Sequence, residues 1–211
     1  MTNITKWIIR LAFLLLFIVL MVLKLPQIWL AIYILSVIIT PFFGRLYCGY
    51  VCPMATVMDP VDRFSKHIGL QRSKERTKRS SYVVSIIMLA VSLAIMIAGK
   101  RLFSKQIPVL PVMLALSVVM TLFFPAHLWH NVFCPFSVAL RLASHNPLRS
   151  YRIDKSVCKG TRRCTKVCPA YAITMVDDGK KAEMDVSLCH QCGACARICP
   201  VSANGYQSKH S

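Results

Sequence analysis

The chain has 211 residues, of which 55% are hydrophobic, a formal net charge of +18 and ten cysteines. Only 16% of its residues are charged, whereas an ordinary soluble domain has about 25%. The hydrophobic excess excludes a disordered chain, and together with the basic charge it argues against a plain soluble nucleic-acid binder. The acidic residues number eight, and none lies within 1–58 or 76–153. These two stretches are therefore where we expect membrane-spanning segments.

Four apolar runs lie in these stretches, at 7–23, 27–43, 81–99 and 109–127. Each has about 17–19 residues, close to what a helix rising 1.5 Å per residue needs to cross roughly 30 Å of hydrocarbon. A chain of this length is too short to bury four such helices in a soluble core, so we predict four transmembrane helices. Lys24-Leu25-Pro26 follows the first run where a signal peptide would have a small-residue cleavage site, so we expect an uncleaved span.

Positive residues are distributed unequally between the two sides of these spans. The connection at 44–80 carries eight of them, whereas the opposite side has only Lys24, Lys100, Arg101 and Lys105. The bias predicts a multi-pass protein of the prokaryotic inner (cytoplasmic) membrane, with the N-terminus, the middle connection and the C-terminal tail in the cytoplasm. Basic loops beside anionic lipid account for much of the charge. The expected partner is therefore the lipid bilayer and not a nucleic acid, even for the basic run at 72–79.

The membrane part contains an internal repeat. Shifting the chain by 82 residues places 46–53 (LYCGYVCP) on 128–135 (LWHNVFCP), and Pro26 on Pro108. The two halves therefore resemble duplicated helical hairpins, each ending in a Cys-Pro pair at the cytoplasmic membrane boundary. Between them, Asp59-Pro60 is typical of a helix N-terminus, and the apolar spacing around it predicts a short helix along the interface.

From about residue 150 the cysteines lie close together. Residues 189–200 (CHQCGACARICP) form a complete C-x2-C-x2-C-x3-C-P run. In such a run three thiolates bind one iron-sulfur cubane and the fourth binds a second one. A zinc site would more often use two separated C-x2-C pairs, and disulfides are not expected in a reducing cytosol.

An incomplete copy of this run lies upstream. Residues 158–169 (CKGTRRCTKVCP) keep the spacing but have Thr161 at the second ligand position. The crossed arrangement predicts one complete 4Fe-4S cluster held by Cys168, Cys189, Cys192 and Cys195. Three thiolates remain for a second cluster, which is either 3Fe-4S or a 4Fe-4S cluster with another ligand on its fourth iron: Cys158, Cys164 and Cys199. The alternative is that this site has decayed and only one cluster is present.

A β-hairpin is predicted between the two runs, with strands at 173–176 and 182–185 around a turn at 177–180. The order of cysteine loop, hairpin and cysteine loop resembles that of bacterial two-cluster ferredoxins over about 149–206. We therefore predict a mainly α protein, with a four-span domain at 1–148 and a small α+β ferredoxin-like domain at 149–211. Four basic residues surround the incomplete site and either favour a reduced cluster or dock the tail onto anionic lipid or an acidic partner: Lys159, Arg162, Arg163 and Lys166.

Residues 44–53 (GRLYCGYVCP) carry a second resemblance. They are similar to the G-R-x-Y-C-G-x-x-C-P element of membrane-bound polyferredoxins associated with periplasmic nitrate reductase and nitrous oxide reductase systems, the NapH and NosR type. Those proteins share the paired C-x3-C-P elements and the ferredoxin tail, so the resemblance covers nearly the whole chain. It implies membrane electron transfer, with electrons taken from quinol or supplied to a metalloenzyme. The chain departs from the pattern at His130 and Thr161, each of which replaces a cysteine.

The membrane cysteines permit several interpretations. Three sulfurs and one imidazole from the two hairpins can converge on a metal or cluster at the interface: Cys48, Cys52, Cys134 and His130. Alternatively, Cys48 and Cys52 form a reversible thiol pair, or all four are buried packing residues. His127 and His130 can in addition take protons from a quinol.

Three functional hypotheses follow. The first is an electron-transfer subunit that passes electrons between a membrane donor, quinol or a partner subunit, and a redox enzyme. The second is a copper or other metal reductase, or a metalloenzyme maturation factor, that uses the membrane Cys/His set. The third is a redox sensor. No nucleotide-binding glycine loop or nucleophile motif is found, so an electron-carrier subunit of an oxidoreductase system is favoured over a stand-alone enzyme.

Overall fold

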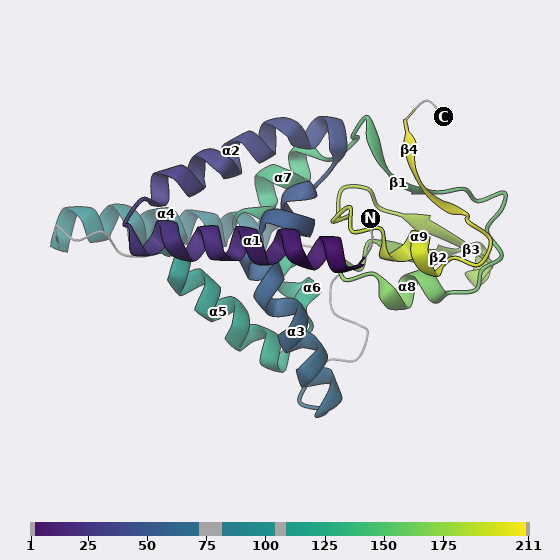
Figure 1. Ribbon diagram of the computed structural model, residues 1–211, viewed down its shortest axis with the longest axis horizontal. Helices are drawn as coiled ribbons and strands as arrows, with labels where there is room; N and C mark the ends of the chain where they lie inside the picture. The colour runs from purple at the N-terminus through teal and green to yellow at the C-terminus, as the bar shows by residue number, and fades with distance from the viewer. Residues whose placement is uncertain (1–2, 72–81, 104–108, 210–211) are drawn as a thin grey trace. The chain divides into compact units, whose positions relative to one another are not determined.

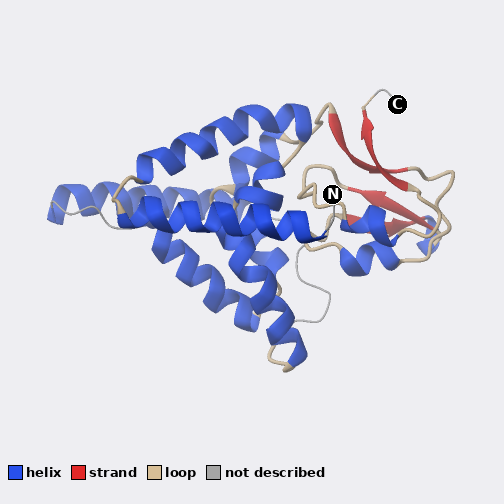
Figure 2. Ribbon diagram, viewed as in Figure 1, coloured by secondary structure: helices blue, strands red, loops and turns tan. Residues whose placement is uncertain are grey.

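The computed structural model describes residues 3–71, 82–103 and 109–209 (Figure 1). Helices make up most of this chain and strands occur towards its C-terminus (Figure 2), so a mainly helical fold with a small strand portion is confirmed. The chain divides into two compact units, Met1–Cys52 with Ala139–Ser211, and Pro53–Val138. The predicted domain boundary at residue 148 stays a prediction.

The first unit joins an N-terminal helical hairpin to the cysteine-rich tail. Its elements are α1 (Asn3–Val22), α2 (Pro26–Phe43), the π-helical turn η1 (Tyr47–Val51), β1 (Arg149–Ile153), α8 (Arg163–Val167), β2 (Ile173–Val176), the 3-10 turn η3 (Asp177–Gly179), β3 (Lys181–Met184), α9 (Ala194–Ile198) and β4 (Asn204–Ser208). The second unit contains α3 (Pro53–His67), α4 (Tyr82–Phe103), α5 (Val109–Phe123), α6 (Ala126–Leu128) and the π-helical turn η2 (Trp129–Phe133). Helix α7 (Ser137–Ala143) runs from the end of the second unit into the first.

Trp29 lies at the centre of the α1–α2 hairpin. Its ring packs edge-on against Phe17, with 5.0 Å between the ring centroids, and its Nε1 donates a hydrogen bond to the hydroxyl of Tyr47 at 3.1 Å. Pro26 occupies the start of α2, where its missing N–H would have no helical partner in any case. These contacts fix the η1 turn against both helices of the hairpin.

Two helices are long and apolar enough to cross a membrane by length and composition, Ile4–Val22 and Pro26–Phe43. Tyr82–Ala98 and Val109–Phe123 are shorter apolar helices. The fourth apolar run ends as a helix at Phe123 and not at residue 127 as predicted. Its end precedes Pro125, and a residue before proline is disfavoured from helical geometry; α6 then begins as a separate turn.

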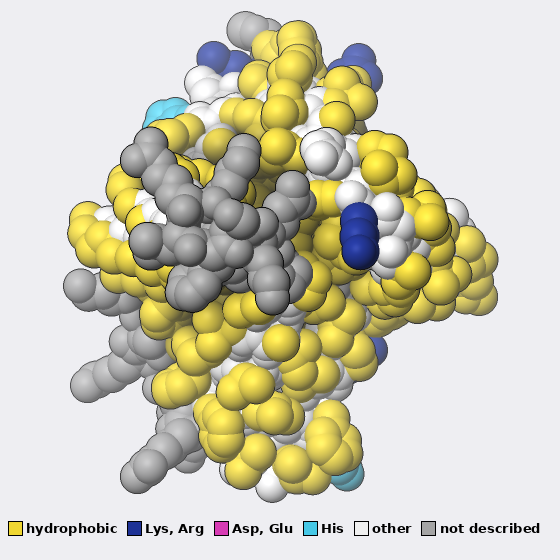
Figure 3. All heavy atoms as spheres, turned by 90° about the vertical axis from the view of Figure 1, so that its left-hand side faces the viewer, with side chains coloured by type: hydrophobic (Ala, Val, Ile, Leu, Met, Phe, Trp, Pro, Cys, Tyr) yellow, Lys and Arg dark blue, Asp and Glu magenta, His cyan; other side chains and the backbone are white. Residues whose placement is uncertain are grey.

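The surface of these helices is strongly apolar. Figure 3 shows hydrophobic side chains over most of the described atoms on one face of the molecule. In the first two helices, little of either apolar stretch is buried, 17% in α1 and 11% in α2. Large apolar side chains that are at least half exposed include Ile8, Leu11, Leu15, Leu30, Ile34, Leu35 and Ile38.

The predicted start of the interfacial helix is wrong. Helix α3 begins at Pro53, directly after Cys52, and continues through Pro60 to His67. Pro53 provides the same preset backbone at the first helical position that the prediction assigned to Pro60. An interior proline costs one backbone hydrogen bond, and the packing of α3 against α5 offsets this loss: the Ser65 hydroxyl donates to the carbonyl of Leu122.

The predicted repeat is visible in local structure. Each half contains a five-residue π-helical turn, η1 and η2, at positions 82 residues apart. Each turn ends in an extended cysteine whose N–H donates to the carbonyl of the first aromatic residue, Cys52 to Tyr47 at 2.8 Å and Cys134 to Trp129 at 2.7 Å. Single π-helical turns are rare and frequently occur at functional sites.

The tail contains two small antiparallel sheets. The predicted hairpin is present as β2–β3, with Ile173 opposite Met184. The second sheet, β1–β4, was not predicted; it pairs Tyr151 with Tyr206, whose rings lie 5.4 Å apart edge to face. This sheet joins the two ends of the tail, and the N–H of Leu148 just before it donates to the carbonyl of Pro41 in α2 at 2.9 Å.

Replacing Asp62 by Ala tests how the second unit is held together. The Asp62 carboxylate accepts hydrogen bonds from Lys66, from Gln71 at 2.9 Å and from the N–H of Ala126 at 3.1 Å. Burial acts to raise the pKa of Asp62, but the hydrogen bonds from Gln71, Lys66 and Ala126 outweigh it and lower the pKa below 3.8. We expect the substitution to destabilise the protein by about 2 kcal/mol, because charged hydrogen bonds are lost, as measured by thermal unfolding in detergent.

The pH dependence gives a second readout. Because the folded pKa is lowered, the contribution of Asp62 is present above about pH 3.8 and is lost as the pH falls through the folded value. Asp62→Ala removes this component of acid sensitivity. Glu183→Ala is the control, since Glu183 pairs with Lys155 and both side chains are 51% exposed, so its loss has little effect. Equal destabilisation by the two substitutions would contradict the prediction.

Candidate iron–sulfur site

The two cysteine runs fold in the same way. Each passes through two residues with positive φ, Gly160 and Arg162 or Gln191 and Gly193, and then forms a five-residue helix, α8 or α9. Cys164 and Cys195 each occupy the second position of their helix. The shared spacing of the two runs therefore produces two equivalent loops.

The four cysteines predicted for the complete cluster are electrostatic neighbours. Burial raises the pKa of Cys189 well above 9.0, and the neighbouring Cys168, Cys192 and Cys195 raise it further. Burial likewise raises the pKa of Cys195 to about 12, with Cys192 and Cys168 contributing. Cys168 comes from the first run and the other three from the second. Cys168 thus lies close enough to the second run to act on its thiols, while the crossed ligand sets themselves stay a prediction.

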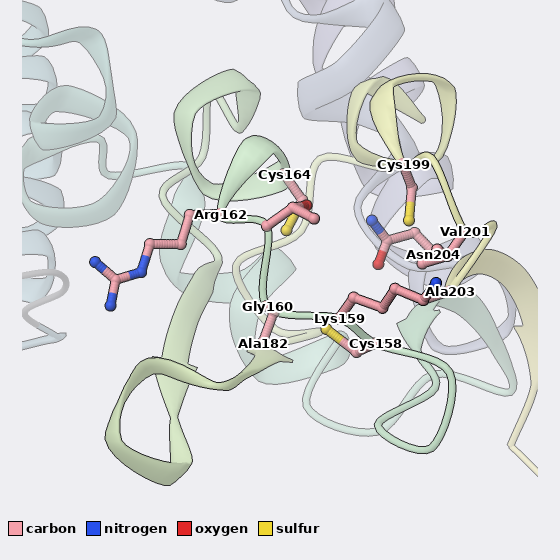
Figure 4. A pocket seen from close by; sticks show the side chains of 11 residues that line it. Cys158, Lys159, Gly160, Arg162, Cys164, Ala182, Cys199, Val201, Ala203 and Asn204 are labelled. Carbon is pink, nitrogen blue, oxygen red and sulfur yellow. The ribbon is translucent and has the colours of Figure 1, made fainter.

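The three remaining tail cysteines line one pocket, shown in Figure 4. Cys158 and Cys164 come from the first run and Cys199 from the second, and the wall of the pocket also includes Thr161. The side chain of Arg162 points away from the pocket in Figure 4. Thr161, which stands at the position of the missing ligand, is exposed. The gap in the ligand set is therefore on the solvent side.

The two cysteine groups are adjacent. The charge of Cys164, from the second group, contributes to the raised pKa of Cys195 in the first. Asn204, in β4, donates a hydrogen bond to the carbonyl of Cys195 at 3.0 Å and also lines the pocket of the second group. The two predicted ligand sets therefore lie side by side in the tail.

The chemistry of these residues fits an iron–sulfur cluster. All ten cysteines are free thiols, and thiolates are the usual ligands of such clusters. In residues 3–71, 82–103 and 109–209, no group of three or more His, Cys, Asp or Glu side chains is placed to hold a single metal ion. Four thiolates around a cubane each bind a different iron, and so they need not converge on one point.

The loop of the complete group packs against the end of the hairpin in the same unit. The Tyr50 hydroxyl, in η1, donates to the carbonyl of Gln191 at 3.2 Å, and Arg45 Nη1 donates to the carbonyl of Ser187 at 3.3 Å. A side chain on Gly49 would place its Cβ 2.1 Å from the carbonyl oxygen of His190. Residues 187–193 are all buried, whereas residues 161–163 of the other loop are exposed. The tail therefore has one side against the hairpin and one side open.

The predicted membrane set is buried but divided between the units. In the first unit, Cys48 lies within η1 and Cys52 directly follows it, and their side chains are 5% and 7% exposed. In the second unit, His130 and Cys134 are 3% and 5% exposed. His127, in α6, is also buried. The interpretation of these residues as a metal site, a thiol pair or packing stays a prediction.

Sequence reasoning missed the residues that join hairpin and tail. Arg45, Tyr50 and Gln191 are buried or half-buried and make the hydrogen bonds described above. At Gly44, a φ of 72° and the Gln191 side chain packed against it require glycine, a role that the motif alone does not indicate. The signal available in the sequence was the occurrence of Gly44, Arg45 and Gly49 around Cys48.

Comparison with known proteins assigns the chain to a class. A family model described as "4Fe-4S binding domain" matches twice, at 25–71 and 106–152, and one described as "4Fe-4S dicluster domain" matches at 150–200. The double match agrees with the internal repeat. The chain is therefore a 4Fe-4S ferredoxin-type protein, and these domains imply that it binds iron–sulfur clusters.

The particular relationship is to NapH. The chain is 24% identical to "Ferredoxin-type protein NapH" of Haemophilus influenzae over 155 residues, which cover 66% of this chain and 53% of that protein. The chain thus spans about half the length of the curated relative that it matches. Together with the family matches, this confirms the resemblance to NapH-type ferredoxin proteins that the motif predicted.

Replacing Gly49 by Ala tests the contact between hairpin and tail. The new Cβ would lie 2.1 Å from a backbone oxygen, so either η1 or the 187–193 loop must move. We expect a loss of about 1–3 kcal/mol, typical of overpacking, and faster cleavage of the tail in limited proteolysis. Gly205→Ala is the matched control, since its Cβ would meet nothing closer than a flexible side-chain atom at 3.4 Å. The prediction fails if both variants resist protease equally.

Proposed function

We propose that the protein carries electrons between a membrane donor, quinol or a partner subunit, and a redox enzyme. The observation that carries this proposal is the asymmetry of the tail. The loop at 187–193, which contributes Cys189 and Cys192, is buried against the hairpin, while the loop that contains Thr161 is exposed. A path through the tail thus has one end beside the predicted membrane segment and the other end accessible to a partner.

The proposed location is the prokaryotic inner membrane, with four spans and the tail in the cytoplasm. Supporting this are the two long apolar helices with mostly exposed side chains, and the shorter apolar helices α4 and α5. Contiguous apolar surface of this kind marks interaction sites, and lipid is the partner that covers whole helices. The excess of Lys and Arg on the connection at 44–80 sets the proposed orientation.

Two sets of cysteines would hold the clusters. Cys168, Cys189, Cys192 and Cys195 form the proposed ligand set of a complete 4Fe-4S cluster. Cys158, Cys164 and Cys199 would hold a second cluster, either 3Fe-4S or 4Fe-4S with another ligand at the Thr161 position. When bound, such clusters supply one-electron transfer at potentials set by hydrogen bonds, nearby charge and solvent exposure. The residues of this chain provide the thiolates, the burial and the charges.

The exposed end of this path carries unpaired positive charge. Lys159, Arg162, Arg163 and Lys166 are all exposed, and within the described part of the chain none of them forms an ion pair. Complementary charges guide the encounter of redox partners and increase the association rate. We therefore propose that the partner presents an acidic face around its own redox centre.

The decisive experiment is anaerobic purification of the full chain in detergent, with iron and sulfide counts and paramagnetic resonance spectra. Two occupied tail sites correspond to roughly seven to eight irons per chain and one complete site to about four. A substantially higher count would indicate a further cluster at the membrane cysteines. Absence of any reducible iron–sulfur signal would overturn the proposed function.

Thr161→Cys tests the second ligand set. The substitution completes the C-x2-C-x2-C-x3-C pattern, so we expect the iron content to rise and any three-iron resonance signal of the oxidised protein to disappear. Thr161→Ser keeps a hydroxyl at this position and should leave both unchanged. An unaltered iron count and spectrum in Thr161→Cys would show that these residues do not surround a cluster.

Charge reversal tests the exposed face. We expect the double substitution of Arg163 and Lys166 by Glu to slow electron exchange with a small acidic ferredoxin by about tenfold at low salt, and the difference to shrink as salt is added. Stopped-flow absorbance measures this rate. Lys209→Glu, an exposed position after β4, is the control for a change of charge alone. If the rate of electron exchange falls by the same factor per reversed charge in the double variant and in Lys209→Glu, a defined docking face is contradicted.

A further inference from the structure

Arg45 is a buried cation without a buried carboxylate. Its exposed fraction is 0%. Nη1 donates to the carbonyl of Ser187 at 3.3 Å and Nη2 to the sulfur of Cys48 at 3.4 Å, while Nε has no hydrogen-bond partner. Within the described residues, no Asp or Glu forms an ion pair with this guanidinium. Its partners in this structure are a backbone carbonyl and a cysteine sulfur.

The local backbone holds Arg45 in this place. Gly44 ends α2 with a positive φ of 72°, which turns the chain, and the side chain of Gln191 packs directly against it. The carbonyl of Ser187 accepts a second hydrogen bond, from the Ser144 hydroxyl at 3.2 Å. The carbonyl that receives Arg45 is thus held from two directions, and it lies two residues before Cys189.

Arg45 contacts one sulfur directly and binds the loop that carries two of the proposed cluster ligands. Cys48 is in direct contact, and the loop that Arg45 binds leads into Cys189 and Cys192. A 4Fe-4S core of charge 2+ on four thiolates has a net charge of 2−, which becomes 3− on reduction. A buried cation stabilises the more negative state more strongly, because the low-dielectric surroundings screen it poorly. Nearby charge and hydrogen bonds are established determinants of cluster potential.

We propose that Arg45 is the counter-cation of the complete tail cluster and raises its reduction potential. Arg45 is a positioning and charge-compensating residue, not a ligand. The inference rests on the proposed function, since it requires that Cys168, Cys189, Cys192 and Cys195 hold a cluster. It adds that the hairpin, and not the tail alone, sets the energy at which the first tail centre is reduced.

The test is a redox titration followed by paramagnetic resonance, on the full chain in detergent. We expect Arg45→Gln to shift the midpoint potential of the complete cluster to a more negative value, and Arg45→Lys, which keeps the charge, to remain near the wild type. Arg152→Gln is the control: Arg152 is a half-buried arginine in β1 that donates to the carbonyl of Pro147. Ser144→Ala removes the other hydrogen bond to Ser187 without changing charge, and should leave the midpoint unchanged.

The outcomes distinguish a charge-compensating role of Arg45 from a purely structural one. If Arg45→Gln keeps the resonance signal of the cluster at the wild-type midpoint potential, the proposal is overturned. The proposal is also overturned if Ser144→Ala shifts the midpoint potential as much as Arg45→Gln does. If Arg45→Gln loses the cluster, retention of the cluster at near wild-type potential in Arg45→Lys supports the role of charge, whereas its loss in both variants overturns it in favour of a structural anchor. A wild-type protein without a reducible cluster would instead refute the proposed function.

Discussion

The close contact between the η1 turn and the cysteine loop at 187–193 is the interaction on which the first unit depends. Gly49 allows the backbone of η1 to meet the carbonyl of His190, at a distance that no side chain at this position would permit. The loop at 187–193 is buried at this contact, whereas residues 161–163 of the other cysteine loop are exposed. Arg45 and Tyr50 also donate hydrogen bonds to this loop, at the carbonyls of Ser187 and Gln191. The separation of a hairpin-facing side from an open side follows from this single contact.

The internal repeat gives the chain two similar π-helical turns, η1 and η2, whose side chains and contacts differ. Both halves form a π-helical turn that is followed by a cysteine in extended conformation and then by a proline. In the first turn, Gly49 carries no side chain and accepts a hydrogen bond from Arg10 at 2.7 Å. In the second turn, the corresponding residue is the fully buried Asn131. The hydroxyl of Ser85 donates a hydrogen bond to the carbonyl of Val132 in this turn at 2.8 Å. Only the first turn thus has the small residue that its contact with the cysteine loop requires.

Much of the fold was predictable because local patterns carried it. The apolar runs, the β2–β3 hairpin and the crossed cysteine groups depend on spacing over a few residues or on a well-known motif. The errors arose where two local signals competed or where the pairing was distant. Pro53 and Pro60 are both acceptable helix starts, and only the packing of α3 on α5 selects the earlier one. The β1–β4 sheet joins segments about fifty residues apart, and neither strand has a distinct apolar alternation.

The sequence by itself determined the class of protein, because cysteine spacing dictates which thiolates can surround a cluster and long apolar runs dictate where helices form. It also indicated that Thr161 interrupts one ligand set. Only the tertiary structure decided which cysteine loop is buried, at 187–193, and which is exposed, at 161–163, since both runs have the same spacing of their shared cysteines. It likewise decided that Arg45 is a buried cation beside a cysteine loop 142 residues away. Burial and the pairing of distant charges are properties of packing, and no local pattern encodes them.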